Sequence, residues 1–335
     1  MAFRFKLGEP FAEGCKRVAL EQLERAQRQL DGADAVVAVH ETRKALKRLR
    51  ALLRLMRPAL GNEVYRAENT ELGDIGRLLS GARDRHVLLE TLTKLEAASG
   101  ASGLVTDTRA ALQSLNGGDA PSTDGDTVRQ AQHRLAAAAK RFSRMRLAGK
   151  GFDVIGPGLE ASYRKARHAF RDAYLKETDE AFHEWRKGTQ QHWRHMGLLS
   201  RAWEESMGAR VSEARRLSQI LGDDHDLALL CAFIQSEHAE YLGAGRASEI
   251  EERARERQRE LRALAQPIGK RLFAEGARNL TRRIAAYWEA AVALDKQDGK
   301  PDGGEERKEH QARKAVASAS RPQRRRGSGP QAKPL

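Results

Sequence analysis

Cysteine and aromatic residues are scarce in this sequence of 335 residues, which holds two cysteines and 5% aromatic side chains. Cys15 and Cys231 have no spacing that suggests a disulfide framework or a metal knuckle, so we expect a reducing compartment. The low aromatic content leaves little material for a β-sandwich core and little platform on which single-stranded bases could stack.

Long apolar runs are lacking as well. No stretch approaches the roughly 18 consecutive apolar residues that a membrane helix needs. The opening residues, MAFRFKLGEPFAEG, contain no apolar segment of the kind found in a secretory signal. We therefore expect a soluble cytoplasmic protein without membrane insertion.

Charge is abundant and unbalanced. Lys and Arg number 60 against 46 Asp and Glu, a formal net charge of +14, and the sequence pI is near 10.0. Such an excess points to anionic partners. Hydrophobic residues make up 40% of the chain, too many for a wholly disordered protein.

Apolar residues recur at helical spacing, and runs rich in β-branched residues between turns are missing. This pattern predicts an all-α fold. Glycine, proline and small polar clusters divide it into segments. The expected helices span 9–30, 34–57, 62–80, 83–98, 104–115, 126–147, 155–176, 179–203, 208–221, 224–240, 246–265 and 268–294.

Beyond Asp295 the composition changes to Gly, Pro, Ser and charged residues with almost no apolar periodicity. Residues 296–335 carry eleven Lys/Arg and five Asp/Glu, a net +6, which leaves +8 for the preceding residues. We expect a disordered basic tail. The positive charge of the chain is thus not only a property of that tail.

Two pairs of similar segments predict an internal repeat. HETRKALKRLR begins at His40 and HEWRKGTQQHWR at His183, and each is followed by a second similar segment, LLSGARDRHVLL from Leu78 and QILGDDHDLALL from Gln219. The prediction is two related helical halves, residues 5–150 and 151–295, followed by the tail at 296–335.

A cationic stripe lies on each predicted histidine helix. At 100° per residue the face of His40 also carries Arg43, Lys44, Lys47 and Arg54, with Arg50 at its edge, while Leu46, Leu49, Leu52, Leu53 and Met56 lie opposite. The face of His183 carries Arg186, Lys187, Gln190, Arg194 and Arg201. Trp185, Met196 and Leu199 lie opposite these. The stripes contain few acidic partners, which favours an anion-binding face over a merely solvated one.

Other charged groups allow two interpretations. Basic clusters at Lys140, Arg141, Arg144, Arg146 and Lys150, and at Arg164, Lys165, Arg167 and Arg171, do not share one helix face. Asp84, Asp224 and Asp226 are expected at helix starts as capping residues. Their alternative role is to hold a metal for phosphate hydrolysis. His192 and His195 fall near the apolar face and are expected in the core.

Taken together, HETRKALKRLR, YRKAR from Tyr163, HEWRKGTQQHW and LGDDHDLALL resemble the signatures of the CHAD family, the conserved histidine α-helical domain. The resemblance covers residues of about 5 to 295. It implies a pair of four-helix bundles whose basic surfaces face a shared groove or pore that binds inorganic polyphosphate. The binding residues it implies are His40, Arg43, Lys44, Lys47, Arg50, Arg54, Arg164, Lys165, Arg167, His183, Arg186, Lys187 and Arg194.

We expect binding without catalysis and without a cofactor, because the sequence shows no converging acidic or His-rich metal site. Association with polyphosphate granules is a further expectation. Gln190 and Gln191 stand where the family often has cations, so binding by the second half is expected to be weaker. Two alternatives stay open at this point. One is a metal-dependent phosphohydrolase that acts on polyphosphate or nucleotides, and the other is a basic protein that associates with nucleic acid through its tail.

Overall fold

A computed structural model of the chain describes residues 3–32, 34–79, 83–100, 103, 106, 125–235 and 244–298. These residues form helices and turns and contain no strand, which confirms the all-α prediction. Contacts divide the chain into the unit Met1–Val292 and the unit Ala293–Leu335. Apart from the last residues of α11, the features described below belong to the first unit.

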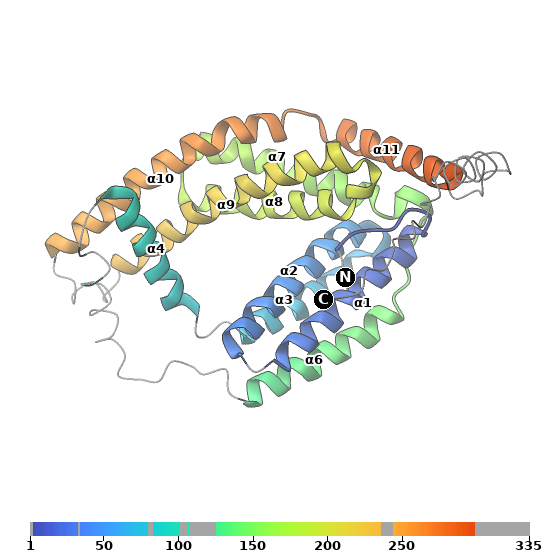
Figure 1. The fold of residues 1–335 in the computed structure, drawn as a ribbon, viewed down its shortest axis with the longest axis horizontal. Helices are drawn as coiled ribbons and strands as arrows, with labels where there is room; N and C mark the ends of the chain where they lie inside the picture. Colours follow the sequence, from blue (N-terminus) through green and yellow to red (C-terminus); the bar gives the residue numbers. More distant parts are fainter. Residues whose placement is uncertain are drawn as a thin grey trace, which may run out of the picture. The chain divides into compact units, whose positions relative to one another are not determined.

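The first set of packed helices comes from the N-terminal part of the chain (Figure 1). It consists of α1 (Phe11–Leu30), α2 (Ala35–Leu60), α3 (Asn62–Leu78) and α6 (Gly125–Ser143). Asp34 starts α2 by accepting a hydrogen bond from the Val37 N–H at 3.0 Å. Gly61 makes the short turn from α2 to α3 with φ of 89°, a conformation that glycine adopts without strain.

The second set follows the short 3₁₀ turn η1 (Gly151–Val154). It consists of α7 (Gly156–Lys176), α8 (Asp179–Leu198), α9 (Glu204–Ile234) and α10 (Ala244–Leu272), with the turn η2 (Ser200–Ala202) before α9. The Thr178 hydroxyl accepts from the Ala181 N–H and so caps α8. The two segments that predict a repeat lie on α2 and α8, and the duplication itself stays a prediction.

One hydrophobic core runs through both sets, because α2 packs against α7 and α8. The residues expected on the apolar faces are buried there, among them Leu49 and Met56 of α2 and Trp185 and Met196 of α8. His192 and His195 are also buried, which confirms their expected place. The N-terminal segment joins this core through Phe5, whose N–H donates to the Leu198 carbonyl at 2.9 Å.

Helix α4 (Arg83–Ser99) belongs to the first half by sequence but packs against α9 and α10. Leu88, Leu92 and Leu95 form a second, smaller core there with residues such as Leu230 and Ile250. The last helix, α11 (Ala277–Asp298), packs Trp288 against Phe5 and Phe11. Helices α4 and α11 therefore each contact residues of the other predicted half.

Several predicted boundaries are wrong. The expected break at 222–223 does not exist, because α9 is continuous from Glu204 to Ile234. Helix α10 continues through Pro267 to Leu272, and α11 reaches Asp298, so that 296–298 of the predicted tail are helical. The helix expected at 104–115 and the tail from 299 lie outside the described residues. None of the described helices combines the length and the apolar composition that crossing a membrane requires.

Candidate functional site

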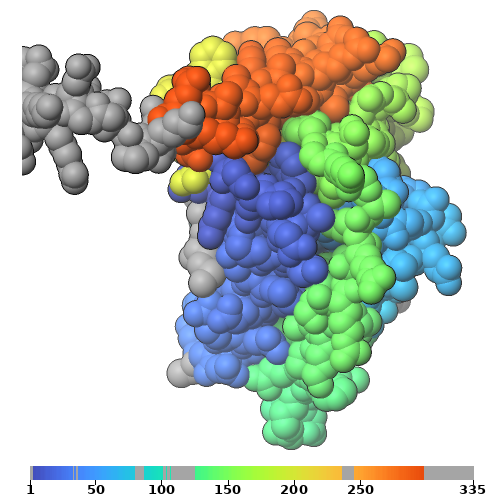
Figure 2. All heavy atoms as spheres, turned by 90° about the vertical axis from the view of Figure 1, so that its right-hand side faces the viewer, coloured from blue at the N-terminus to red at the C-terminus, as the bar shows by residue number. Residues whose placement is uncertain are grey.

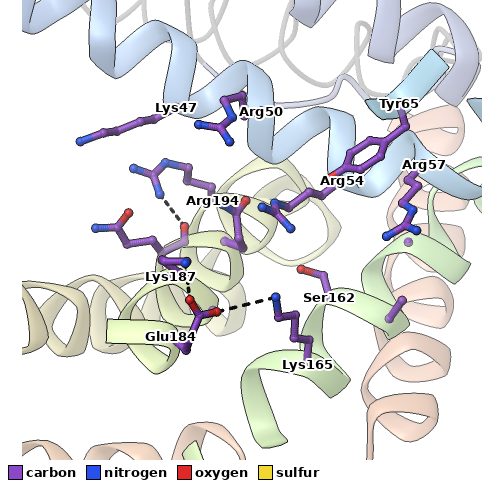
Figure 3. Close-up of a pocket in the computed structure, with 15 residues that line it drawn as sticks. Lys47, Arg50, Arg54, Arg57, Tyr65, Ser162, Lys165, Glu184, Lys187 and Arg194 are labelled. Atoms are coloured by element: carbon purple, nitrogen blue, oxygen red, sulfur yellow. Dashed lines mark hydrogen bonds and ion pairs between the residues drawn. The ribbon is translucent and has the colours of Figure 1, made fainter. Parts of the chain in front are cut away.

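A cavity of about 400 Å³ lies among α2, α7 and α8, and we call it the basic cavity (Figure 3). Seven cationic side chains and one carboxylate line it: Lys47, Arg50, Arg54, Arg57, Lys165, Lys187, Arg194 and Glu184. Uncharged polar lining comes from Tyr65, Ser162, Gln190 and Gln191. The wall of the basic cavity thus carries a strong excess of positive charge.

Helix α2 supplies four of these cations. Lys47, Arg50, Arg54 and Arg57 follow one another at spacings of three, four and three residues, which places them on one helix face over about 15 Å at a rise of 1.5 Å per residue. The opposite face is the buried one, which contains Leu49, Leu52 and Leu53. Burial of that face turns the cationic row toward α7 and α8.

Residues of helix α8 form the opposite wall of the basic cavity. Lys187, Gln190, Gln191 and Arg194 lie on one side of it, and the fully buried Trp185 fixes the other side in the core. In Figure 3 the Arg194 side chain lies between Lys187 and the α2 row. Its Nη1 donates to the Gln190 carbonyl at 2.7 Å, and its guanidinium lies 4.6 Å from the Trp193 ring centroid. Arg194 is therefore held in place at the wall.

Two glycines allow the three helices to approach closely. A Cβ atom at Gly158 of α7 would stand 2.0 Å from the Leu55 carbonyl oxygen of α2. A Cβ atom at Gly188 of α8 would stand 2.8 Å from Ala166 Cα of α7. Any larger residue would push the backbones apart. These contacts set the width of the basic cavity.

Gly158→Ala is expected to destabilise the fold by about 1–3 kcal/mol, because the helix backbones must separate to admit the methyl group. Gly208→Ala is the matched control, since a Cβ at Gly208 in α9 meets nothing within 4 Å. It should stabilise the fold by about 0.5–1 kcal/mol through helix propensity. Urea unfolding of both variants measures the difference, and equal stabilities would contradict the close approach of α7 and α2.

The charges of the basic cavity are poorly compensated. Burial, followed by the neighbouring charges of Arg48 and Arg186, lowers the pKa of Arg194 to about 10. Burial, followed by the charge of Arg54, also lowers the pKa of Arg50. Arg194 remains a cation at neutral pH. A lowered pKa means that the surroundings disfavour the charged form.

Neutralising partners are few. Among the described residues no carboxylate lies within 4 Å of Arg50, Arg54 or Arg194. In the part of the chain that the structure describes, the buried Nε atoms of Arg54 and Arg194 have no hydrogen-bond acceptor. An unsatisfied buried N–H costs about 1–3 kcal/mol, so an incoming anion would satisfy groups that the protein leaves open.

The single carboxylate, Glu184, is already engaged. It forms an ion pair with Lys187 and lies 3.8 Å from Lys165 Nζ. Burial would raise the pKa of Glu184, but the hydrogen bond from Lys187 and the charges of both lysines lower it. Glu184 is therefore an anion that positions two lysines at the wall (Figure 3).

Six of the thirteen predicted binding residues line the basic cavity: Lys47, Arg50, Arg54, Lys165, Lys187 and Arg194. Gln190 and Gln191, the two residues for which we expected weaker binding by the second half, also line it. These two uncharged side chains therefore lie within the site itself.

The first turns of the α2 stripe do not reach the basic cavity. Arg43 Nη1 donates to the Gly76 carbonyl of α3 at 3.3 Å. Lys44 pairs with Glu41 at 2.6 Å, and His40 lies on the exposed surface. These three residues share the helix face with Lys47 but lie beyond the end of the cavity.

The other predicted residues point to different neighbours. Arg164 pairs with Glu160, and Arg167 Nε donates to the Phe273 carbonyl at 2.9 Å, where it helps to close the end of α10. His183 lies with its Nδ1 3.1 Å from Nδ1 of His225 in α9. Arg186 also faces α9, since a Cβ at Gly222 would stand 3.8 Å from its Nε.

Sequence reasoning missed Arg57 and Tyr65. Arg57 Nε donates to Asn62 Oδ1 at 2.8 Å, and its guanidinium lies 5.0 Å from the Tyr65 ring centroid. The signal for Arg57 was its position three residues after Arg54. For Tyr65 no such signal exists, because it comes from α3 and meets the α2 row only after folding.

The predicted capping role of Asp224 and Asp226 is wrong, because both lie within the continuous helix α9. Asp224 is 2% exposed and pairs with Arg262 of α10 at 2.7 Å. Burial raises its pKa even though Arg262 opposes the shift. The side chain of Asp84 lies outside the described residues. Within the part of the chain that the structure describes, no group of three or more His, Cys, Asp and Glu side chains is placed to hold a metal ion.

The family model of the CHAD domain matches residues 17–235, which include α2, α7, α8 and thus every cationic residue of the basic cavity. No curated protein matches the chain.

Proposed function

Because this chain belongs to the CHAD domain family, we propose that it binds inorganic polyphosphate in the basic cavity and holds it without cleaving it. The observation that carries the proposal is the convergence of seven Lys and Arg side chains, against one carboxylate, on one cavity between three helices.

Polyphosphate suits such a wall because it carries negative charge along its whole length. Arginine presents paired N–H donors to phosphate oxygens, and lysine adds a compact charge. Each contact releases counterions from the polyanion, which favours binding at low salt. Arg54 and Arg194 each have a buried Nε donor that finds no acceptor among the described residues.

The lining favours polyphosphate over nucleic acid. Tyr65 is the aromatic residue among those that line the basic cavity, and it is 7% exposed with Arg57 over its ring. A base would have no exposed ring on which to stack. Polyphosphate has no bases and therefore needs no aromatic ring for stacking.

Binding without turnover is the second part of the proposal. Glu184 is held between Lys165 and Lys187, and Asp224 is committed to Arg262. Neither carboxylate is free to act as a base toward bound phosphate. A protein that holds polyphosphate without consuming it would collect on polyphosphate granules. The granule and cytoplasmic locations stay predictions.

Titration calorimetry with long-chain polyphosphate is expected to show binding that weakens steeply with salt. Duplex DNA, added as a competitor, should displace it poorly at moderate salt. A parallel assay with Mg²⁺ should detect no phosphate release. Stronger binding of DNA than of polyphosphate would contradict polyphosphate as the ligand. Phosphate release by the natural chain that is lost in His40→Ala would contradict the absence of turnover.

A further inference from the structure

A second group of cations lies in the loop between α6 and η1. Arg144, Arg146 and Lys150, which we call the loop patch, are all exposed. Met145 and Leu147, which alternate with the two arginines, pack against the main core. Arg146 lies between Met145 and Leu147, and burial of these two neighbours turns its side chain outward. Arg144 lies in the turn that follows α6, where its N–H donates to the Arg141 carbonyl.

The loop lies beside the end of α2 that carries Arg57. The Ala148 N–H donates to the Ala59 carbonyl at 3.0 Å, and Arg57 is two residues before Ala59. Because two residues span at most about 7 Å, the backbones of Arg146 and Lys150 lie within that distance of Ala148. Figure 2 shows this loop as part of the green segment on the surface, next to the light-blue residues around the α2–α3 turn.

The loop patch also has no neutralising partner. Among the described residues no carboxylate lies within 4 Å of Arg144, Arg146 or Lys150. Two arginines of the preceding helix α6 do have carboxylate partners. Arg134 makes two hydrogen bonds with Glu71, and Arg141 makes two with Glu68.

Arg146 and Lys150 of the loop patch are too far along the chain to stabilise α6 through its helix dipole. Cations stabilise a helix C-terminus only within its last turn. Helix α6 ends at Ser143, so Arg146 and Lys150 lie beyond that turn.

We infer that the loop patch continues the basic cavity, so that a polyphosphate chain longer than the cavity passes Arg57 and binds across the loop. This inference rests on the proposed function. It adds a second subsite that short chains do not reach, because the α2 row spans only about 15 Å. Long-chain polyphosphate is therefore bound more tightly than a short chain, and the difference in affinity exceeds what its end groups or its net charge alone would predict.

The test compares two probes, inorganic tripolyphosphate and long-chain polyphosphate, by calorimetry over a range of salt concentrations. The first variant carries Arg144→Gln, Arg146→Gln and Lys150→Gln. The control carries Arg215→Gln, Arg259→Gln and Lys270→Gln, which remove the same charge from exposed positions of α9 and α10 outside the basic cavity.

The loop variant is expected to weaken long-chain binding at least tenfold and to reduce its log–log salt slope by about two, since flexible single strands lose about 0.7 per contact. Tripolyphosphate binding should stay unchanged, and the control should alter neither. An equal loss with tripolyphosphate, an equal loss in the control, or a loss of DNA binding alone would overturn the inference. Long-chain binding that is insensitive to the loop variant would overturn it while leaving the proposed function intact. Absence of any polyphosphate binding by the natural chain would overturn both.

Discussion

Replacing Lys47, Arg50 and Arg54 together with glutamine is expected to weaken polyphosphate binding by about 1,000-fold or more at low salt. A hydrogen bond to a charged group contributes about 1.5–3 kcal/mol, and three such contacts are removed from one wall of the basic cavity. The salt slope should fall by about two. The fold should persist, because these side chains lie on the face of α2 opposite the buried leucines.

A matched variant separates the cavity from the stripe. Arg43→Gln, Lys44→Gln and Arg164→Gln remove the same charge from residues that the sequence also predicts as ligands. The structure directs all three to other partners. Calorimetry should show a loss of less than tenfold. If this variant binds as poorly as the cavity variant, the binding surface is the whole helix face and not the basic cavity.

Arg262→Met is expected to destabilise the fold by about 3–5 kcal/mol, because it leaves a buried carboxylate without its partner. Arg262 pairs with Asp224 and with Asp179, the first residue of α8, and its guanidinium lies 4.1 Å from the Phe182 ring centroid. Asp179 retains Arg255 at 2.7 Å, whereas Asp224 loses its only ion pair among the described residues. Denaturant unfolding measures the loss.

The destabilisation should depend on pH. Burial already raises the pKa of Asp224 in the folded protein, and removal of Arg262 raises it further. An acid whose folded pKa is raised destabilises the fold above that pKa, and this effect diminishes as pH falls and the carboxyl gains its proton. The deficit of Arg262→Met should therefore shrink between neutral pH and mild acid. Adding Asp224→Asn should recover part of the stability at neutral pH, and a double variant no better than the single one would contradict this account.

Periodicity predicted the faces of α2 well, but it could not predict which turns of the cationic face meet another helix. Lys47 and Arg43 are one turn apart and equivalent by angle. Only the packing of α7 and α8 against α2 distinguishes them, since it encloses Lys47 and leaves Arg43 with the Gly76 carbonyl. A helical wheel records angle and contains no information on position along the partner helix.

The predicted helix boundaries are wrong where tertiary packing outweighs the local preference of the sequence for a helix break. Pro267 removes a backbone donor, which locally favours a break. Two residues later a Cβ at Gly269 would stand 2.6 Å from Trp185 Cζ2 and 2.7 Å from Phe170 Cε2, so this part of α10 is pressed into an aromatic cluster. Gly222 does not interrupt α9 either, although a Cβ there would meet only the Arg186 guanidinium, at 3.8 Å. Tertiary contacts of this kind are not visible in a local sequence window.

The uncompensated arginines of the basic cavity also bear on how this sequence can change. The native contacts of a folded protein are expected to support one another. Residues whose interactions with their neighbours are unfavourable therefore mark places that are selected for function and not for stability. Arg50 is repelled by Arg54, and Arg194 is repelled by Arg48 and Arg186, so neutral residues in place of Arg50 and Arg194 would fold more easily. The basic cavity is thus a region of local frustration, and selection for stability alone would erase it first.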